Sequence, residues 1–442
     1  GIIISTLDIP ETSYTFVKNR GPDHTNKITV NNIHFVHFLL HLTGKKTLQP
    51  LVENNIVVIF NGEIYNYKEL YEDAPSDIYS ILHTYKTYGE EFIRYLDGEF
   101  TIVLFDFNKD LLFISGDIFK TKPLFYNVSN KDITIASYIS SCNTINKNTY
   151  QSIQPNQVLI FDLHKRTLIR SYKIYEFDLQ QYKTTYDDYM QALETSILKR
   201  YPEHHIPLVT LSSGMDSGAI ACCLHKHNKQ ALYVTIPNNE HPYIIKYRQD
   251  ILKEQHKILH MNLYTNQGEE KKYWVNYLKK NCEQLEWNWM DHPKLKTINN
   301  GQTMGSMLGK SKIITLTQSI DPKIKILFSG IGADEILARN QFYSNGWGNV
   351  NIFPEDLKTV FPWNNVYKGT MENYLKGDEY VGGCFGFETR YPFCDKDVVQ
   401  EFLWLKPNLK NSFNNNIVKP PLAYYLHTHA FPYHLQKLGW QV

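Results

Sequence analysis

The chain has 442 residues, of which 42% are hydrophobic, and its 46 basic and 45 acidic residues nearly cancel. This length is enough for two or three domains, each with its own core. The near-neutral total argues against a dedicated nucleic-acid or membrane surface, and no apolar run approaches the roughly 20 residues that a membrane-spanning helix needs. The opening GIIISTLDIP lacks the basic region and cleavage pattern of a signal peptide. The six cysteines form no C-x-x-C pair, so we expect free thiols and a cytoplasmic, reducing location.

The first part of the chain, residues 1–177, contains many short β-prone runs separated by turn residues such as NGE, DGE and FNKD. One helix is expected at Asp77–Tyr88. The pattern predicts a mostly antiparallel fold of stacked sheets. The expected strands are Gly1–Ser5, Ile33–Leu42, Ile56–Phe60, Thr101–Phe107, Leu111–Ser115, Ile133–Ser137 and Gln157–Leu163.

A polar stretch at residues 178–186 marks the expected domain boundary, after which strands and helices alternate. This alternation predicts a parallel sheet with helices on both faces. From about residue 268 onward the pattern is mostly helical, interrupted by one strong strand at Lys325–Phe328. The alternating elements are a helix at Tyr189–Arg200, a strand at Leu208–Leu211, a helix at Ser217–His225, a strand at Ala231–Ile236, a helix at Tyr243–Gln255 and a strand at Lys257–Met261.

The stretch LSSGMDS, residues 211–217, lies between an apolar strand and the first turn of a helix. Ligands bind at the carboxyl ends of parallel strands, and backbone N–H groups at a helix start favour an anion such as phosphate. Asp216 would repel a phosphate unless a cation lies between them, so its presence predicts Mg²⁺. The alternative is an ordinary Ser/Gly turn with an Asp near a helix start.

A second stretch, SGIGADE at residues 329–335, has the same layout, because it follows a strand and carries Asp334 in the first turn of the next helix. If the two strands are neighbours, Asp216 and Asp334 face each other across one metal–phosphate group.

These motifs are similar to those of the asparagine synthetase family. SSGMDS resembles the pyrophosphatase loop of ATP-dependent adenylating ligases, SGIGADE resembles the second loop of asparagine synthetases, and FGFETRYPFCDKDVV (385–399) resembles a later segment of the same enzymes. The resemblance implies an α/β adenylating (PP-loop) domain over residues 181–442, with a helical C-terminal part, that binds ATP and Mg²⁺. It assigns the metal to Asp216 and Asp334, and ATP to Leu211, Ser212, Ser213, Gly214, Asp216, Ser217, Ile236, Ser329 and Gly330.

The first half resembles class II glutamine amidotransferase domains through RGPD, IFNGEIYNYKEL, LDGEFTIVLFD and GDIFKTKPLFY. The resemblance implies an Ntn-type αββα sandwich over residues 1–180. Asn61 and Gly62 would then form the oxyanion hole, and Glu63 and Asp77 would hold the amino group of glutamine. The amino-terminal cysteine nucleophile of this family would stand immediately before Gly1. It is therefore trimmed, substituted or omitted here, or glutaminase activity is absent.

A second departure concerns the arginine that holds the carboxylate of glutamine in this family. Leu39 stands at that position, and Lys45 or Lys46 is the candidate substitute.

By the same resemblance, ATP activates a carboxylate as an acyl-adenylate, and ammonia then forms the amide. Glu388 is expected to act at the catalytic site, and Lys437 to stabilise the pentavalent phosphate. Lys419 matches another basic position of the family. Ile331 stands where asparagine synthetases have Glu, so aspartate is a weaker candidate for the acceptor.

Alternatives remain for the function as a whole. The acceptor is aspartate, a sugar acid, a peptide or an intramolecular carboxylate. A second alternative is a non-catalytic descendant of the family that binds a nucleotide or a partner. A third is an RNA-modifying adenylase, and the balanced charge of the chain counts against this third alternative. The expected partners are ATP, glutamine or ammonia, and a carboxylate, without nucleic acid or membrane, and a homodimer is a further expectation.

Overall fold

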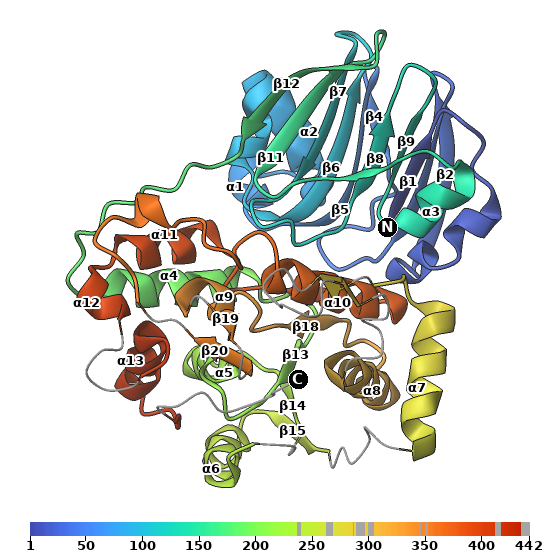
Figure 1. Cartoon of the computed structure of the whole chain (residues 1–442). Coiled ribbons are helices and arrows are strands. Elements are labelled where there is room, and N and C mark those ends of the chain that lie inside the picture. Colours follow the sequence, from blue (N-terminus) through green and yellow to red (C-terminus); the bar gives the residue numbers. More distant parts are fainter. Residues whose placement is uncertain are drawn as a thin grey trace. The chain divides into compact units, whose positions relative to one another are not determined.

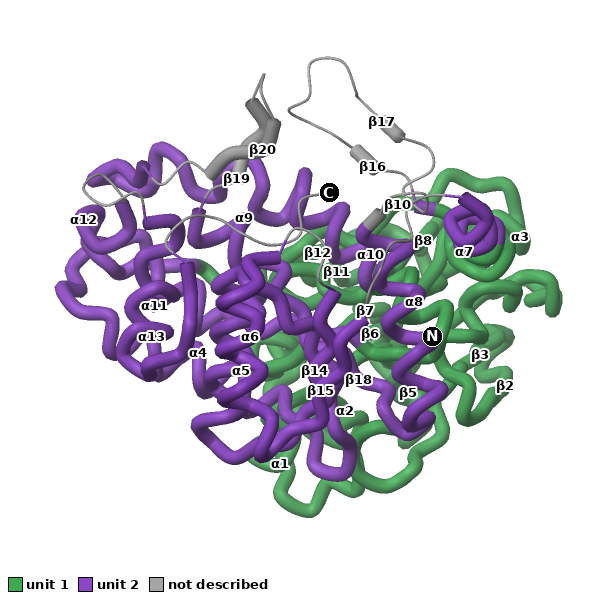
Figure 2. Tube along the Cα trace, turned by 90° about the horizontal axis from the view of Figure 1, so that it is seen from below, with its two compact units in different colours: residues 1–176, 277–284, 379–388 green, residues 177–276, 285–378, 389–442 purple. Residues whose placement is uncertain are grey.

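The computed structural model of the chain describes residues 1–236, 240–261, 268–285, 305–338, 352–411 and 417–434, and the backbone of four short strands between residues 287 and 349. The chain divides into two compact units (Figure 2). Unit 1 contains residues 1–176, 277–284 and 379–388, and unit 2 contains residues 177–276, 285–378 and 389–442.

Unit 1 is built on two six-stranded antiparallel sheets (Figure 1). One sheet has the strand order β10-β8-β9-β1-β3-β2 and the other has the order β12-β11-β7-β6-β5-β4. The strands are β1 (Ile2–Ser5), β2 (His24–Val30), β3 (Ile33–Leu39), β4 (Leu51–Glu53), β5 (Ile56–Ile64), β6 (Gly98–Asp106), β7 (Leu111–Gly116), β8 (Phe125–Val128), β9 (Ile133–Ala136), β10 (Gln151–Ser152), β11 (Gln157–Asp162) and β12 (Thr167–Lys173). The helices are η1 (Glu11–Tyr14), η2 (Val17–Arg20), α1 (Tyr67–Leu70), α2 (Asp77–Tyr88), η3 (Gly89–Tyr95) and α3 (Ile139–Ile145).

The core of unit 1 lies on both faces of the second sheet. Alternate side chains of β5 point to opposite faces, and both sets are apolar from Ile56 to Phe60. Val57 and Ile59 pack against Ile4 and Phe35 of the first sheet, whereas the side chains between them pack against α2. Helix α3 contacts β8 and β9 of the first sheet. The layers are therefore helix, sheet, sheet and helix, which confirms the predicted αββα sandwich.

Unit 2 contains a five-stranded sheet with the order β15-β14-β13-β18-β21. The pairs β13–β14, β13–β18 and β14–β15 are parallel. In Figure 1, α5 and α6 lie on one side of these strands and α8 lies on the other, as predicted for an α/β domain. The strands of this sheet are β13 (Leu208–Thr210), β14 (Leu232–Thr235), β15 (Lys257–His260), β18 (Ile326–Phe328) and β21 (Glu388–Arg390).

The remaining elements follow residue 177. The helices are α4 (Asp187–Lys199), α5 (Met215–Lys226), α6 (Pro242–Leu252), α7 (Gly268–Asn281), α8 (Gly305–Ile320), α9 (Ala333–Leu337), η5 (Leu357–Thr359), α10 (Thr370–Cys384), α11 (Lys396–Trp404), α12 (Pro407–Lys410) and α13 (Pro420–Thr428). The short strands are β16 (Trp287–Asn288), β17 (Thr297–Ile298), β19 (Asn340–Tyr343) and β20 (Gly346–Asn349).

The predicted elements differ from the structure mainly at the sheet edges. Helix α2 has the bounds predicted for it, but β2 and β12 were not predicted. Both are edge strands whose side chains are mostly exposed, so they lack an apolar alternation. Among the described residues, no helix is both long and apolar enough to cross a membrane.

Candidate functional site

Two loops of unit 2 leave neighbouring parallel strands at the same edge of the sheet. Strands β13 and β18 pair with Leu208 opposite Leu327, and each is followed by a short loop and a helix. Because parallel strands end at a common edge, the two loops meet there. Gly330 permits this approach, because a Cβ atom on Gly330 would lie 2.9 Å from the Cβ of Asp216.

The carboxylates of Asp216 and Asp334 converge on one side chain, that of Lys419. Its Nζ lies 2.5 Å from Asp216 Oδ1 and 2.8 Å from Asp334 Oδ1. Burial lowers the pKa of the Lys419 ammonium, but the two carboxylates outweigh this effect and hold the pKa above its ordinary value. The two acids thus already share one cation. Paired carboxylates on one cation fit a divalent ion such as Mg²⁺, which prefers oxygen ligands.

The first loop is held by its own hydroxyl groups. Ser212 Oγ and Ser217 Oγ lie 2.6 Å apart, and Gly214 N–H donates to Ser212 Oγ at 3.1 Å. Ser213 donates from its backbone N–H, at 2.5 Å, and from its hydroxyl to one carboxylate oxygen of Glu240. A phosphate oxygen needs the same pair of donors, so the loop fits the phosphates of a nucleotide.

Two apolar residues that the resemblance assigns to ATP lie at the start of this loop and at the end of the neighbouring strand β14. Leu211 and Ile236 are both buried. The backbone N–H of Leu211 donates to Val234 O at 2.9 Å, which joins the start of the loop to the end of β14.

Two charged residues at the first loop were not singled out in the sequence, Glu240 and Arg248. Arg248 is buried and donates from Nη1 to the carbonyl oxygens of Ser212 and, at 2.9 Å, Gly214. Neither residue belongs to a motif, and each contacts a loop that lies 27 to 36 residues earlier in the chain. No local sequence signal therefore identifies them.

The second loop is held by a buried acid. Ser329 Oγ donates to Asp378 Oδ2 at 2.9 Å, and Lys310 pairs with the same carboxylate. Gly332 adopts φ +99°, and a Cβ atom there would lie 2.8 Å from Cys394 Sγ. Only glycine adopts this backbone conformation readily, and the space is closed to a side chain. The loop is therefore fixed on both sides of Ile331.

Unit 1 has a pocket lined by residues of β3 and β5 and by the first residue of the chain. Its lining includes Leu39, Asn61, Gly62, Lys122 and Glu388, together with the backbone at residue 1. Asn61 Nδ2 is buried and has no hydrogen-bond partner among the described residues. An unpartnered buried donor costs free energy, so a ligand oxygen at this point would be stabilised.

Gly62 is required by the backbone of β5. It has φ +132°, and a Cβ atom on it would lie 1.9 Å from Glu99 O. Leu39, at the expected arginine position, lines the pocket, whereas Lys45 and Lys46 are absent from its described lining.

Of the three carboxyl groups proposed as site residues in this part of the chain, that of Glu388 is in the described lining of the pocket, whereas those of Glu63 and Asp77 are not. Glu63 Oε2 accepts a hydrogen bond of 2.5 Å from Thr43 Oγ1. Asp77 Oδ2 accepts one of 3.3 Å from the backbone N–H of Ile64. Burial raises the pKa of Asp77 to about 7, and the charge of Glu388 adds to the increase.

The sequence placed Glu388 with the carboxylate-activating chemistry, and the structure places it in the lining of the unit 1 pocket. Lys437 lies outside the described residues, so the role proposed for it stays a prediction.

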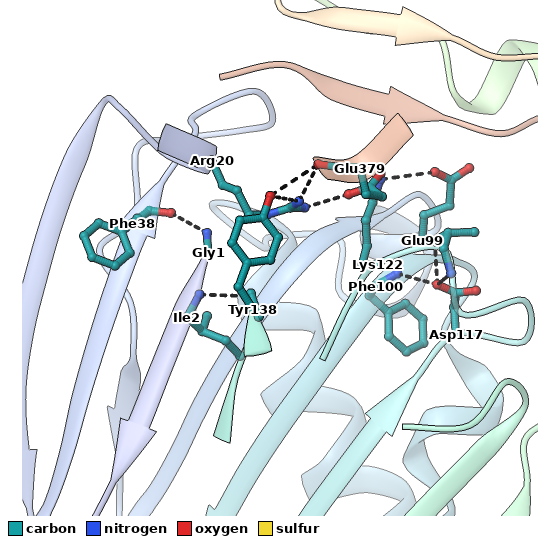
Figure 3. A network of polar contacts seen from close by, with 12 residues as sticks. Gly1, Ile2, Arg20, Phe38, Glu99, Phe100, Asp117, Lys122, Tyr138 and Glu379 are labelled. Atoms are coloured by element: carbon teal, nitrogen blue, oxygen red, sulfur yellow. Dashed lines mark hydrogen bonds and ion pairs between the residues drawn. The ribbon is translucent and has the colours of Figure 1, made fainter. Parts of the chain in front are cut away.

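A buried ion network supports the pocket (Figure 3). Glu379 receives Arg20 Nη2 at 2.6 Å and Lys122 Nζ at 2.9 Å, and Arg20 Nη1 also donates to Tyr138 OH at 3.1 Å. Burial raises the pKa of the Glu379 carboxyl, but the two cations outweigh burial and hold it below its ordinary value. Arg20 and Lys122 belong to the motifs RGPD and KTKPLFY, but no role was predicted for either side chain.

Comparisons with known proteins agree with both halves of the chain. Residues 7–178 match the glutamine amidotransferase domain family. A protein of Methanocaldococcus jannaschii named as a glutamine-hydrolysing asparagine synthetase is 26% identical over 419 residues, covering 88% of this chain and 72% of that protein. A protein of Schizosaccharomyces pombe with the same type of name is 23% identical, with coverage of 90% and 73%. Asparagine synthetase 1 of Saccharomyces cerevisiae is also 23% identical, with coverage of 89% and 72%.

Proposed function

We propose that this relative of the glutamine-hydrolysing asparagine synthetases is an ATP-dependent amide-forming ligase. The observation that carries the proposal is the convergence of Asp216 and Asp334 on one cation, at adjoining loops of a parallel sheet. A carboxylate oxygen of the acceptor attacks the α-phosphorus of ATP and pyrophosphate leaves. Ammonia then attacks the acyl carbon, and AMP leaves with the oxygen that it gained.

The residues of unit 2 bind and orient the nucleotide in this scheme. Asp216 and Asp334 hold Mg²⁺, which offsets the negative charge of the phosphates when it is bound. Ser213 donates to a phosphate oxygen through the two groups that now hold Glu240. Lys419 would give up its contacts with the two carboxylates when the metal binds. Its ammonium group could then contact the negatively charged phosphates, which also favour a positive charge.

Unit 1 supplies ammonia from glutamine in this proposal. Asn61 Nδ2 and the backbone N–H of Gly62 stabilise the oxyanion formed at the side-chain amide, and the free donor of Asn61 supports this role. Glu63 and Asp77 bind the α-amino group. The family that the first half resembles uses an amino-terminal cysteine as its nucleophile, and mass spectrometry of the intact protein tests whether a cysteine stands directly before Gly1.

A second candidate differs only in the acceptor. Ile331 stands between the two fixed glycines of the second loop, and an aliphatic side chain cannot bind the α-ammonium group of aspartate. This residue favours a carboxylate without that group, such as a sugar acid or a peptide.

Exchange of labelled pyrophosphate into ATP, measured with a panel of carboxylates that includes aspartate, tests the proposal. We expect exchange only with the correct acceptor, and we expect Asp216→Asn and Asp334→Asn each to reduce it by about 100-fold or more, because each removes a metal ligand. Asp250→Asn is a matched control, because the ion-pair partners of Asp250 among the described residues are two exposed lysines, Lys246 and Lys253. ATP binding without any exchange would instead support a non-catalytic descendant.

A further inference from the structure

The guanidinium group of Arg248 is buried beneath the first loop, and no described carboxylate lies within ion-pair distance of it. It donates to three carbonyl oxygens, those of Ser212, Gly214 and, at 2.8 Å from Nε, Pro432. Nη2 is buried and has no hydrogen-bond partner among the described residues. Because burying a charged group away from water is unfavourable, the presence of Arg248 here needs an explanation beyond packing.

Gly218 makes the space for this side chain. A Cβ atom on Gly218, in the first turns of α5, would lie 2.4 Å from Arg248 Nη2 and 2.7 Å from its Cζ. Even alanine would therefore displace the guanidinium. The pair of Gly218 and Arg248 forms one fitted contact between α5 and α6.

The stereochemistry of the peptide group relates this contact to the binding face of the loop. In a trans peptide the C=O of one residue and the N–H of the next point in opposite directions. Arg248 binds the C=O of Ser212, so the N–H of Ser213 points away from it, toward the carboxylate of Glu240. The same relation directs the N–H of Met215 away from the bound C=O of Gly214.

We propose that Arg248 is a positioning residue for the nucleotide. It holds the carbonyl groups of Ser212 and Gly214 inward, so that the N–H groups of the same peptides face the triphosphate, and its positive charge adds to the attraction for that anion. The role rests on the proposed function, since it requires that the loop binds phosphates. Desolvation, which lowers the pKa of Arg248 to about 10, leaves the group charged at neutral pH.

Isothermal titration calorimetry of the full chain tests this role. The ligands are a non-hydrolysable ATP analogue and adenosine, each with Mg²⁺. We expect Arg248→Met to weaken binding of the ATP analogue by about 10- to 100-fold, and to leave adenosine binding within about twofold, since only the phosphates need the oriented N–H groups. Arg248→Lys keeps the charge but cannot span both carbonyl groups, so we expect a smaller loss. Lys246→Met removes an exposed cation from the same helix and should change neither affinity.

A second pair of variants separates folding from positioning. Gly218→Ala alone should lower the melting temperature, because its Cβ meets the guanidinium. Gly218→Ala combined with Arg248→Ala should restore the melting temperature but not the affinity for the ATP analogue. The inference is overturned if Arg248→Met or the double variant folds normally and binds the ATP analogue as tightly as the unaltered chain. If the unaltered chain binds adenosine and the ATP analogue equally, the proposed phosphate site itself fails.

Discussion

The two units hold their buried charges in different ways. In unit 1, Arg20 and Lys122 each pair with the buried carboxylate of Glu379. At the loops of unit 2, Asp216 and Asp334 share Lys419, and Ser213 holds a carboxylate. In unit 1, both cations are paired with a carboxylate of the protein. The groups of unit 2 are ones that a metal ion and a phosphate would bind, so a ligand can replace each partner. Buried ion pairs that no ligand replaces can support a binding site from outside it. Ion pairs whose partners a ligand can replace can form the binding site itself.

The largest effect is expected from removing Glu379, the carboxylate that pairs with Arg20 and Lys122 in unit 1. Glu379→Ala leaves Arg20 and Lys122 buried without their shared partner, and we expect the free energy of unfolding to fall by about 3–5 kcal/mol. Denaturant titration of the full chain measures it. Glu53→Ala removes the carboxylate of an exposed pair in the same unit and should cost less than about 1 kcal/mol. Equal effects of the two variants would show that the buried network is not a structural support.

The pH dependence of unit 1 is the next largest effect. The folded pKa of Asp77, about 7, lies above its ordinary value of 3.8. Its contribution to stability is therefore complete below pH 3.8 and is lost as the pH rises through about 7. Between pH 5 and pH 8, we expect the free energy of unfolding of the unaltered chain to fall by about 2 kcal/mol more than that of Asp77→Asn. Unfolding titrations across this range measure the slope, and an unchanged slope would contradict the assignment.

Lys419 tests whether the pairs of unit 2 are exchangeable. Lys419→Met removes the cation that competes for Asp216 and Asp334, so we expect the affinity for Mg²⁺ without nucleotide to rise by about tenfold. Calorimetry with Mg²⁺ alone measures it. Lys396→Met, at an exposed ion pair of the same unit, is the control. Weaker metal binding in Lys419→Met would show that the lysine organises the site and does not compete for it.

The smallest effect is expected at Glu240, where a substitution should strengthen nucleotide binding and not weaken it. Its carboxylate occupies the two donors of Ser213, and a neutral amide accepts weaker hydrogen bonds than a carboxylate. We therefore expect Glu240→Gln to bind a non-hydrolysable ATP analogue about three- to fivefold more tightly. Glu254→Gln, at an exposed position near the end of α6, should leave the affinity unchanged. Weaker binding in Glu240→Gln would mean that Glu240 supports the loop in the bound state.

Sequence reasoning succeeded where the signal is local. The bounds of α2 follow from its apolar period and its start after Ser76, and the two loops were located because each joins a buried strand to a helix. The convergence of Asp216 and Asp334 was predicted from the expected adjacency of their strands, and the structure brings them together on Lys419.

The residues that were missed have partners far away in the chain. Glu379 binds Arg20 across 359 residues and Lys122 across 257. Arg248 and Gly218 each have an ordinary local context, and only their contact reveals a role. A single sequence contains the periodicity that forms helices and strands, but it does not state which distant side chains meet.

The lysine shared by the two aspartates has a consequence for the order of events as the chain folds. Two carboxylates brought close together repel each other, so without a cation the two loops would resist coming together. Lys419, which belongs to the same chain, offsets this repulsion. Under the proposed function, the two loops can thus take up their positions before a metal ion or nucleotide binds, and metal binding would be an exchange of one cation for another.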